Sequence, residues 1–250
     1  MLMDTGMKRI CPECSNSKIW KLKDGRFRCT KCRKTFADPR PLIRISKIRL
    51  RQVIQEFVLE HSTNIILSRV DISKYMLLKI LTVLRVAMTA DVADVFDGAV
   101  EVDETYLGGT WKNKRLGVKR KSVKPRRGRG ASKQPVFGIL CRNGKVWAEL
   151  IDSVEAKQLQ PKILKQVKKG WTIFSDTWSG YTGIAAKGYV HRLVKHGPDS
   201  YVTNGNHING LEGFWGYLKR KLAAKGGVRR SRLHLYLGEY VWRYNHRHLD

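Results

Sequence analysis

The second half of the chain alternates short apolar runs with longer amphipathic stretches, and this alternation limits the possible folds more than any other feature. Residues 136–141 and 146–151 are apolar runs that flank Arg142-Asn143-Gly144-Lys145. Asn-Gly between two such runs is a strong signal for the tight turn of a β-hairpin. Further strands are expected at residues 99–107, 171–175 and 189–194.

Helices are expected between these strands, where apolar residues recur at helical spacing. They cover residues 155–168, 181–187 and 209–222. The order of elements in residues 97–250 is therefore β-β-β-α-β-α-β-α, which is that of a ribonuclease H-like α/β domain, a mixed sheet flanked by helices. In that fold the first strand is central and the fourth strand lies beside it.

Three acidic residues stand at the ends of these elements. Asp103 closes an alternating run in the first strand, Asp176 ends the fourth strand, and Glu212 lies at the start of the last helix. If the two strands pair and the helix packs across their ends, the three carboxylates converge. Taken singly, each residue is as well explained as an ordinary solvated acid.

Two other acids in the first strand compete with Asp103. Glu101 lies on the same strand face by the period of two, and Glu104 is the next residue along. We favour Asp103 because a carboxylate nearer the strand end meets solvent and substrate.

Such an acidic trio suits the cleavage of a phosphodiester. The reaction needs an activated oxygen nucleophile and relief of charge on the leaving oxygen, which two divalent ions about 4 Å apart can supply. Mg2+ prefers hard oxygen ligands, so a few carboxylates suffice. We expect Asp103 to bridge both ions, Asp176 to hold one and Glu212 to hold the other.

The charge of the chain points to a polyanionic partner. It carries 49 Lys and Arg against 21 Asp and Glu, a formal net charge of +28. This excess favours nucleic acid before an anionic membrane. No apolar run reaches the ~18 residues of a membrane span, and the first nine residues lack the apolar segment of a secretory signal. We therefore expect a cytoplasmic protein with no membrane partner.

Residues 8–38 contain two pairs of cysteines. Cys11-x2-Cys14 and Cys29-x2-Cys32 can each form a tight turn that presents two thiolates, and together they can close a tetrahedral Zn2+ site. In a reducing compartment this spacing indicates a metal rather than disulfides. Asp24-Gly25 between two short strand candidates predicts a hairpin, as in a zinc ribbon. The ribbon either contacts DNA or only nucleates a small fold.

Residues 42–92 are helical in pattern, with two or three helices joined by short turns. One helix begins near Asp71 or Ser73, either of which can cap it. Helices of this size can form a helix-turn-helix that binds DNA. No glycine marks the turn, and a helical linker bundle explains the pattern equally well.

A basic segment separates the first strand from the hairpin. Residues 111–133 hold eleven Lys or Arg and no acid. The simplest interpretation is a flexible loop. We prefer an arm that grips phosphates and becomes ordered on DNA, because no role in the core is open to it.

Further polar residues surround Glu212. His207 and Asn209 can bind the scissile phosphate or orient a metal ligand, although Asn209 is an equally reasonable N-cap. Lys219 follows Glu212 by seven residues, or two helical turns, and so shares its face and can reach a phosphate. Trp215 is expected in the core, with stacking on an unpaired base as the alternative.

Three segments, around Asp103, Asp176 and Glu212, resemble the DDE transposases of bacterial insertion sequences: VEVDETYLGG, FSDTWSGY and HINGLEGFWGYLKRKL. The most similar branch has an N-terminal zinc ribbon and a catalytic motif of the form H-x-N-x-x-E. Residues 240–247 are similar to the closing helix of that family. The resemblance covers nearly the whole chain, while the helical region matches only loosely.

The resemblance implies a ribonuclease H-like catalytic domain that uses Mg2+ or Mn2+, with Asp103, Asp176 and Glu212 as its triad and Lys219 as the basic residue after the Glu. It implies that the N-terminal regions recognise inverted-repeat ends. It also implies hydrolysis that frees a 3′-hydroxyl, followed by attack of that hydroxyl on target DNA. Because transposases join two DNA ends, we expect at least a homodimer on DNA.

Two other functions fit the same residues. One is a DNA-binding protein without catalysis, either a regulator that uses the ribbon and helices or a decayed copy. If relatives extend beyond the position of Asp250, which follows the closing motif closely, we expect this copy to be truncated and inactive. The other is a metal-dependent nuclease without strand transfer. Intact carboxylates favour catalysis over binding alone.

Overall fold

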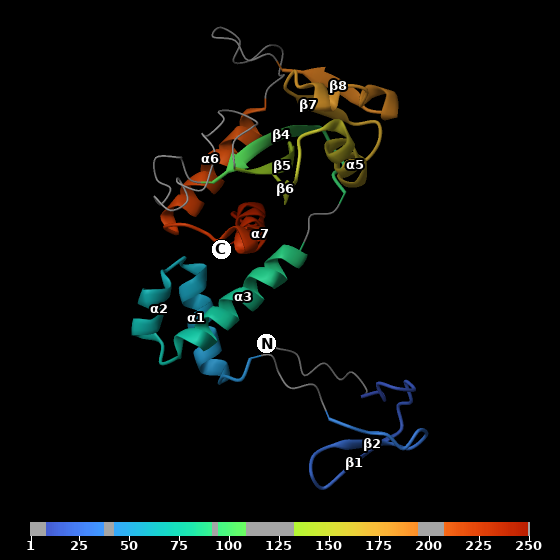
Figure 1. Cartoon of the computed structure of the whole chain (residues 1–250), viewed down its shortest axis with the longest axis vertical. Helices are drawn as coiled ribbons and strands as arrows, with labels where there is room; N and C mark the ends of the chain where they lie inside the picture. Colours follow the sequence, from blue (N-terminus) through green and yellow to red (C-terminus); the bar gives the residue numbers. More distant parts are fainter. Residues whose placement is uncertain (1–8, 38–42, 92–94, 109–132, 195–207, 250) are drawn as a thin grey trace, which may run out of the picture. The chain divides into compact units, whose positions relative to one another are not determined.

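The structure is a computed structural model that describes residues 9–37, 43–91, 95–108, 133–194 and 208–249 (Figure 1). The chain divides into two compact units, Met1–Leu77 and Leu78–Asp250. The boundary falls inside a helix, and the predicted borders of the three sequence regions stay predictions. No helix in the described ranges has the length and apolar character needed to cross a membrane.

The first unit begins with a small antiparallel sheet of three strands: β1 (Ile19–Lys21), β2 (Phe27–Cys29) and β3 (Thr35–Phe36). The turn between β1 and β2 contains Gly25 at a φ of 81°. This left-handed conformation favours glycine, which has no Cβ to clash. The Asp24 carboxylate accepts the backbone N–H of Arg26 at 3.0 Å. The predicted Asp-Gly hairpin is confirmed.

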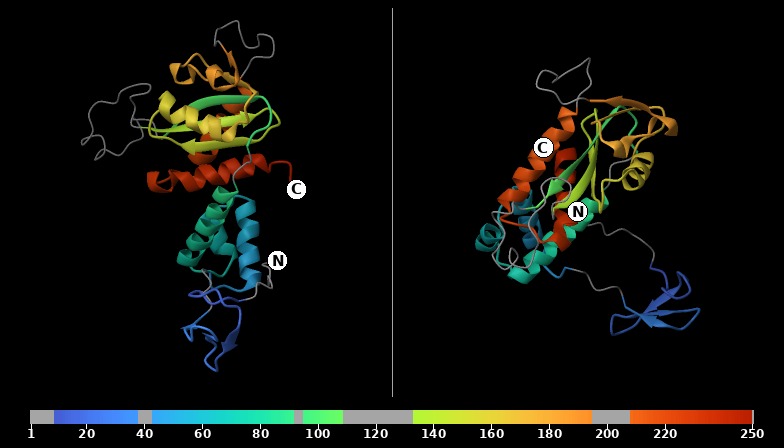
Figure 2. Two further views of the ribbon diagram at one scale, coloured as in Figure 1. Left: turned by 90° about the vertical axis from the view of Figure 1, so that its right-hand side faces the viewer. Right: turned by 45° about the horizontal axis from the view of Figure 1, so that its top comes forward.

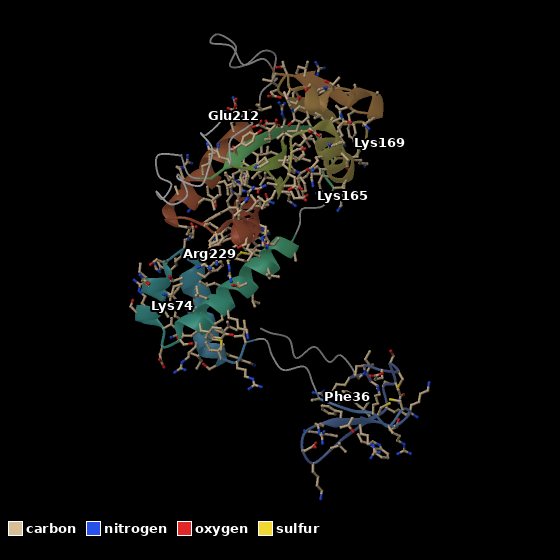
Figure 3. The ribbon with its side chains drawn as sticks, viewed as in Figure 1. Phe36, Lys74, Lys165, Lys169, Glu212 and Arg229 are labelled. Atoms are coloured by element: carbon tan, nitrogen blue, oxygen red, sulfur yellow. The ribbon has the colours of Figure 1, made fainter. Side chains whose placement is uncertain are left out.

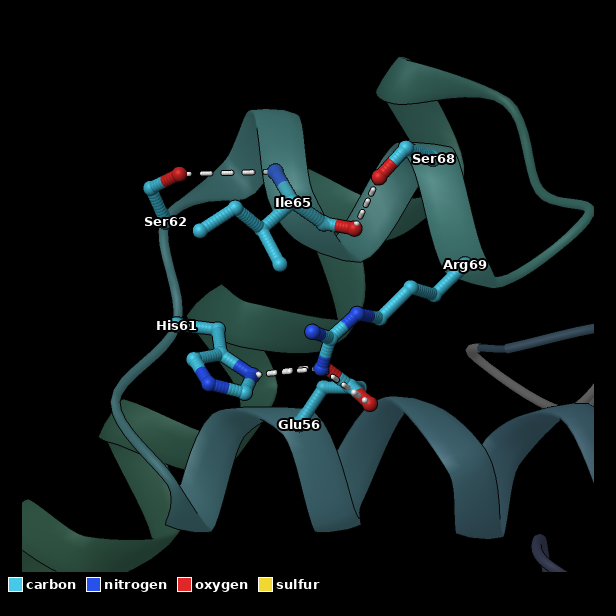
Figure 4. Close-up of polar contacts among 6 residues, drawn as sticks. All are labelled: Glu56, His61, Ser62, Ile65, Ser68 and Arg69. Atoms are coloured by element: carbon cyan, nitrogen blue, oxygen red, sulfur yellow. Dashed lines mark hydrogen bonds and ion pairs between the residues drawn. The ribbon is translucent and has the colours of Figure 1, made fainter.

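Two helices of the first unit, α1 (Lys47–Val58) and α2 (Thr63–Arg69), are joined by a short turn. The Glu56 carboxylate on α1 contacts the ring of His61 at 2.6 Å and the guanidinium of Arg69 at 3.2 Å (Figure 4). These contacts tie the end of α2 to α1. The helix-turn-helix interpretation stays a prediction.

Helix α3 (Lys74–Ala90) starts in the first unit and continues into the second. The Ser73 hydroxyl accepts the backbone N–H of Met76 at 3.2 Å. Ser73 therefore satisfies one of the free N–H groups at this helix start, as a capping side chain does. The other candidate cap, Asp71, instead forms an ion pair with Arg49 at 2.6 Å.

The second unit is built on a five-stranded mixed sheet in the order β6-β5-β4-β7-β8. Its strands are β4 (Val100–Leu107), β5 (Gln134–Cys141), β6 (Val146–Leu150), β7 (Thr172–Ser175) and β8 (Val190–Leu193). β4 is central, antiparallel to β5 and parallel to β7. The prediction of a central first strand with the fourth strand beside it is confirmed.

Helices cover both faces of this sheet (Figures 1 and 2). α5 (Ala156–Gln166) packs on one face, and α6 (Asn209–Ala224) with α7 (Leu233–Asn245) packs on the other. Because side chains alternate along a strand, β4 sends Val100 and Val102 into the core with α5, and Leu107 into the core with α6 and α7.

The helix predicted at residues 181–187 is wrong. Two separate 3-10 turns, η3 (Ser179–Tyr181) and η4 (Ala185–Lys187), occupy this stretch. Gly183 between them has a φ of 84°. A continuous right-handed helix needs a negative φ at every residue, so it cannot pass through this position.

The second part of α3 is anchored to α7 by a buried charge cluster. The Glu239 carboxylate contacts Arg85 at 2.7 Å and Arg243 at 3.0 Å. Next to it, a Cβ added to Gly238 would collide with the Thr89 hydroxyl oxygen. The two helices therefore touch where only glycine fits.

Candidate active site

Two of the three predicted acids come together where β7 ends beside β4. The parallel register pairs Val100 with Ile173 and Glu101 with Phe174. Continued by two residues, this register brings Asp176 next to Asp103 on strands about 4.8 Å apart. β7 stops at Ser175, whereas β4 continues to Leu107, so β7 no longer pairs with this last part of β4. We call the place where β7 ends beside β4, bordered by Asp103 and Asp176, the notch.

Helix α6 crosses this notch and brings the third acid. The Trp215 indole N–H donates to Asp103 Oδ2 at 3.0 Å. Gly138, the register partner of Asp103 on β5, makes room for the indole, because a Cβ there would lie 2.6 Å from the ring. Glu212 lies three residues before Trp215, exposed in the first turn of α6 (Figure 3).

The electrostatics link all three acids. The pKa of Asp103 is raised to about 6, chiefly because burial disfavours its charged form. Hydrogen bonds from the Glu104 backbone and from Trp215 oppose this shift, whereas the charges of Asp176 and Glu212 add to it. Asp176 and Glu212 are far from Asp103 in the sequence, but both therefore lie close enough for their charges to raise its pKa.

The oxygens of the three acids do not, among the described residues, form a group compact enough to share one ion. A pair of ions about 4 Å apart does not need such a group, since the two outer carboxylates then bind different ions. The donor set consists of three carboxylates, and such hard oxygen ligands suit hard divalent cations.

The two alternatives to Asp103 are engaged elsewhere. Glu101 is 1% exposed and accepts the backbone N–H of Leu211 at 2.9 Å. Glu104 points to the opposite face of the sheet, where it accepts the hydroxyl of Tyr181. Asp103 is thus the acid of β4 that borders the notch.

The remaining predicted residues have different placements. Asn209 is the exposed first residue of α6, and Ile208 occupies the N-cap position without a capping side chain, so the N-cap role of Asn209 is wrong. Lys219 is exposed farther along α6. His207 and nearly all of the basic segment 111–133 lie outside the described residues.

Lys219 lines a cavity of about 890 Å³ at the far end of β4. Lys133 and Arg230 line the same cavity. The Gln134 side-chain oxygen accepts two bonds from the Arg230 guanidinium, at 2.9 and 3.1 Å, and so fixes its orientation. The cavity therefore gathers three cationic side chains beyond the acidic notch.

The four paired cysteines form a second candidate site, in the first unit. The sulfur atoms of Cys11, Cys14, Cys29 and Cys32 all lie within 4.8 Å of one another. Asn16 donates to the Cys29 sulfur at 3.5 Å. Four thiols at this spacing could hold one metal ion, and they match the ligand set of a structural Zn2+ site.

Several contacts around the notch were not predicted from sequence. The bond from Trp215 to Asp103 joins residues 112 positions apart, and the bond from Tyr181 to Glu104 joins residues 77 apart. A single sequence carries no signal for contacts between residues so far apart. An indole N–H can also donate to many different acceptors, so its partner cannot be predicted from its residue type.

The chain belongs to the ISXO2-like transposase domain family, a family of DDE transposase domains, whose model matches residues 95–245. It is 31% identical over 101 residues to an uncharacterized transposase-like protein of Haemophilus influenzae, a match that covers 40% of this chain and 81% of that protein.

Two solved structures are also similar. The catalytic core domain of BIV integrase matches with a TM-score of 0.36 and 17% identity, over 57% of this chain and 81% of that one. The Mos1 transposase, in a paired-end complex with the left transposon end, matches with a TM-score of 0.34 and 10% identity, over 82% of this chain and 60% of that one.

Proposed function

We propose that this transposase binds the inverted-repeat ends of an insertion sequence and catalyses DNA cleavage and strand transfer with two divalent ions at the notch. One observation carries the proposal. Asp103 lies beside the end of β7, which leads into Asp176, and is hydrogen-bonded to Trp215 on the helix that bears Glu212.

The three acids have distinct parts in this proposal. Asp103, Asp176 and Glu212 would hold the two ions, with Asp103 as the central ligand and Asp176 and Glu212 as the outer ones. Mg2+ or Mn2+, when bound, activates an oxygen nucleophile and neutralises charge on the leaving oxygen. Trp215 holds one oxygen of Asp103 in place, and preorganised ligands of this kind lower the cost of binding ions and substrate.

The DNA strand, in this proposal, runs from the notch along α6 to the cationic cavity. Lys133, Lys219 and Arg230 bind its phosphates there, since Lys and Arg supply most phosphate contacts. The cysteine site holds Zn2+ and stabilises the ribbon, and the regions before residue 92 recognise the element ends. Two ends must meet for transfer, so the acting form is at least a dimer on DNA.

The decisive experiment incubates the full chain with candidate element ends, a target duplex and Mg2+, with products read on a sequencing gel. We expect nicks at the element end that leave a 3′-hydroxyl, and joined products with target DNA. Nicks without joining would indicate a nuclease, and a bound but uncut end would indicate a DNA-binding protein.

A matched pair of variants tests the assignment of the site. Asp103→Asn should abolish cleavage while leaving DNA binding largely intact. Asp152→Asn makes the same change at an exposed acid outside the notch and should cut like the parent. If Asp103→Asn also cuts like the parent, the proposed ion site is wrong.

A further inference from the structure

Glu101 is a buried acid with no part in the proposed chemistry. Its side chain is 2% exposed. Burying a carboxylate is costly unless it is paired and hydrogen-bonded. One oxygen accepts the backbone N–H of Leu211 at 2.9 Å, and the other lies 3.9 Å from Arg142 Nε. The buried carboxylate thus meets groups from α6 and from the turn between β5 and β6.

The first of these groups is the N-terminus of α6. The first N–H groups of a helix have no partner within the helix, and here no side chain at the N-cap position supplies one. Glu101 does so from a neighbouring strand, where its negative charge also meets the positive end of the helix dipole. Leu211, which it binds, directly precedes Glu212.

The close approach of helix and strand depends on Gly210. A Cβ at this position would lie 3.0 and 3.4 Å from the two Glu101 oxygens and 3.2 Å from a methyl group of Leu140. The two shorter distances are tighter than most Cβ contacts in proteins, so a larger residue would force Glu101 and Leu140 to shift by a few tenths of an ångström.

The second group connects Glu101 to the strand that leads to Asp176. The Arg142 guanidinium carbon lies 3.8 Å from the centre of the Phe174 ring. At this distance the cation is attracted to the face of the ring. Phe174 is the β7 partner of Glu101 and precedes Asp176 by two residues. One carboxylate on β4 therefore joins α6 and, through Arg142, the end of β7.

We infer that Glu101 is a positioning residue that holds α6 and β7 against β4, so that Asp103, Asp176 and Glu212 meet at the notch. This inference rests on the proposed function, because it assigns Glu101 a task in the assembly of the same ion site. Glu101 acts through the backbone of Leu211 and through Arg142, and does not itself contact an ion.

The test measures Mn2+ binding by calorimetry in the full chain, with Asp103→Asn as the blank for ions held elsewhere. Residues that orient metal ligands typically contribute roughly 10- to 100-fold in affinity. We expect Glu101→Ala to weaken Asp103-dependent Mn2+ binding by about this factor. Glu101→Gln keeps an oxygen for the Leu211 N–H and should recover part of the affinity.

A second readout does not depend on any ion. Hydrogen exchange at the Leu211 amide should be at least about tenfold faster in Glu101→Ala than in the parent, because the amide loses its acceptor. Exchange in the core strand β5 should stay slow, which separates a loosened helix end from global unfolding.

Two glycines of α6 provide a matched control that leaves Glu101 intact. Gly210→Ala should weaken Mn2+ binding as Glu101→Ala does, whereas Gly213→Ala, whose added Cβ meets nothing within 4 Å, should leave it unchanged.

Failure of this inference and failure of the proposed function look different. If Asp103→Asn removes Mn2+ binding but Glu101→Ala and Gly210→Ala bind as tightly as the parent, the positioning role is wrong and the ion site stands. If Asp103→Asn binds Mn2+ like the parent, the ion site is wrong and the positioning role falls with it.

Discussion

At the scale of single residues, the notch is defined by what surrounds Asp103. Burial and the two neighbouring acids raise the pKa of this residue to about 6, while Trp215 donates a hydrogen bond that opposes the shift. The position of Asp103 in a strand followed from alternation in the sequence. The hydrogen bond from Trp215 to Asp103 could not be predicted in the same way, because Trp215 has the same apolar spacing as an ordinary core residue of α6.

Two substitutions should move the pKa of Asp103 in opposite directions in the metal-free protein. Asp176→Asn removes a negative charge and should lower this pKa, whereas Trp215→Phe removes a donor to the carboxylate and should raise it. Carboxyl-carbon NMR titration measures both shifts. An unchanged pKa in Asp176→Asn would mean that the two acids are not neighbours.

The raised pKa has a consequence for stability. In the folded metal-free protein Asp103 binds its proton up to about pH 6, compared with the ordinary value of 3.8, so between these values the native state holds more protons than the unfolded chain. Its stabilising contribution is present below about pH 4 and is lost as the pH rises through about 6.

Asp103→Asn should therefore be more stable than the parent at pH 7, with the difference shrinking as the pH falls toward 4. Urea unfolding of both proteins in chelator across this range measures the difference. A variant that is less stable than the parent at pH 7 would contradict the cause given for the shift.

At the scale of elements, the sheet of the second unit was largely predictable. The Asn-Gly turn and the buried run before Asp176 predicted the ends of strands β4 to β7 to within one or two residues. These ends are predictable because turn signals and the period of a strand are local features of the sequence. The first residue of α7 was not predicted, because packing against β6 and α6, rather than a local signal, determines where this helix begins. The 3-10 turns were missed because Gly183 interrupts a stretch that otherwise has helical composition.

Helix α7 is held to α3 by the buried Glu239 carboxylate, which contacts both Arg85 and Arg243. Glu239→Ala should destabilise the protein by about 3–5 kcal/mol, because it leaves the two guanidinium groups without their shared acid in a buried site. Glu149→Ala removes an exposed acid paired with Lys162 and serves as the control. It should cost less than about 1 kcal/mol. Chemical denaturation measures the loss of unfolding free energy in both variants. Equal losses would show that the buried cluster stabilises the protein no more than an exposed ion pair does.

At the scale of the whole molecule, the charge of +28 and the cysteine spacing were both readable from composition and motif. The four thiols are gathered as the spacing predicted, because each pair sits in a local turn and the pairs are brought together by one short hairpin. The acidic notch could be only partly foreseen, since its three members come from elements that the chain assembles over more than a hundred residues.

Binding to element-end DNA should weaken steeply with salt. A protein that makes roughly 6–10 phosphate contacts loses about 10³–10⁵ in affinity between about 50 and 200 mM salt. The triple variant of Lys133, Lys219 and Arg230 to Ala should reduce the slope of log affinity against log salt by about three, one per contact. Fluorescence anisotropy at several salt concentrations measures the slope, and an unchanged slope would exclude the cavity from the DNA path.

Anomalous diffraction from crystals of the protein with element-end DNA and Mn2+ tests the ion site most directly. Two peaks about 4 Å apart are predicted at the notch, with Asp103 between them and with Asp176 and Glu212 on opposite sides. A single peak, or peaks away from these three carboxylates, would contradict the proposed two-ion site.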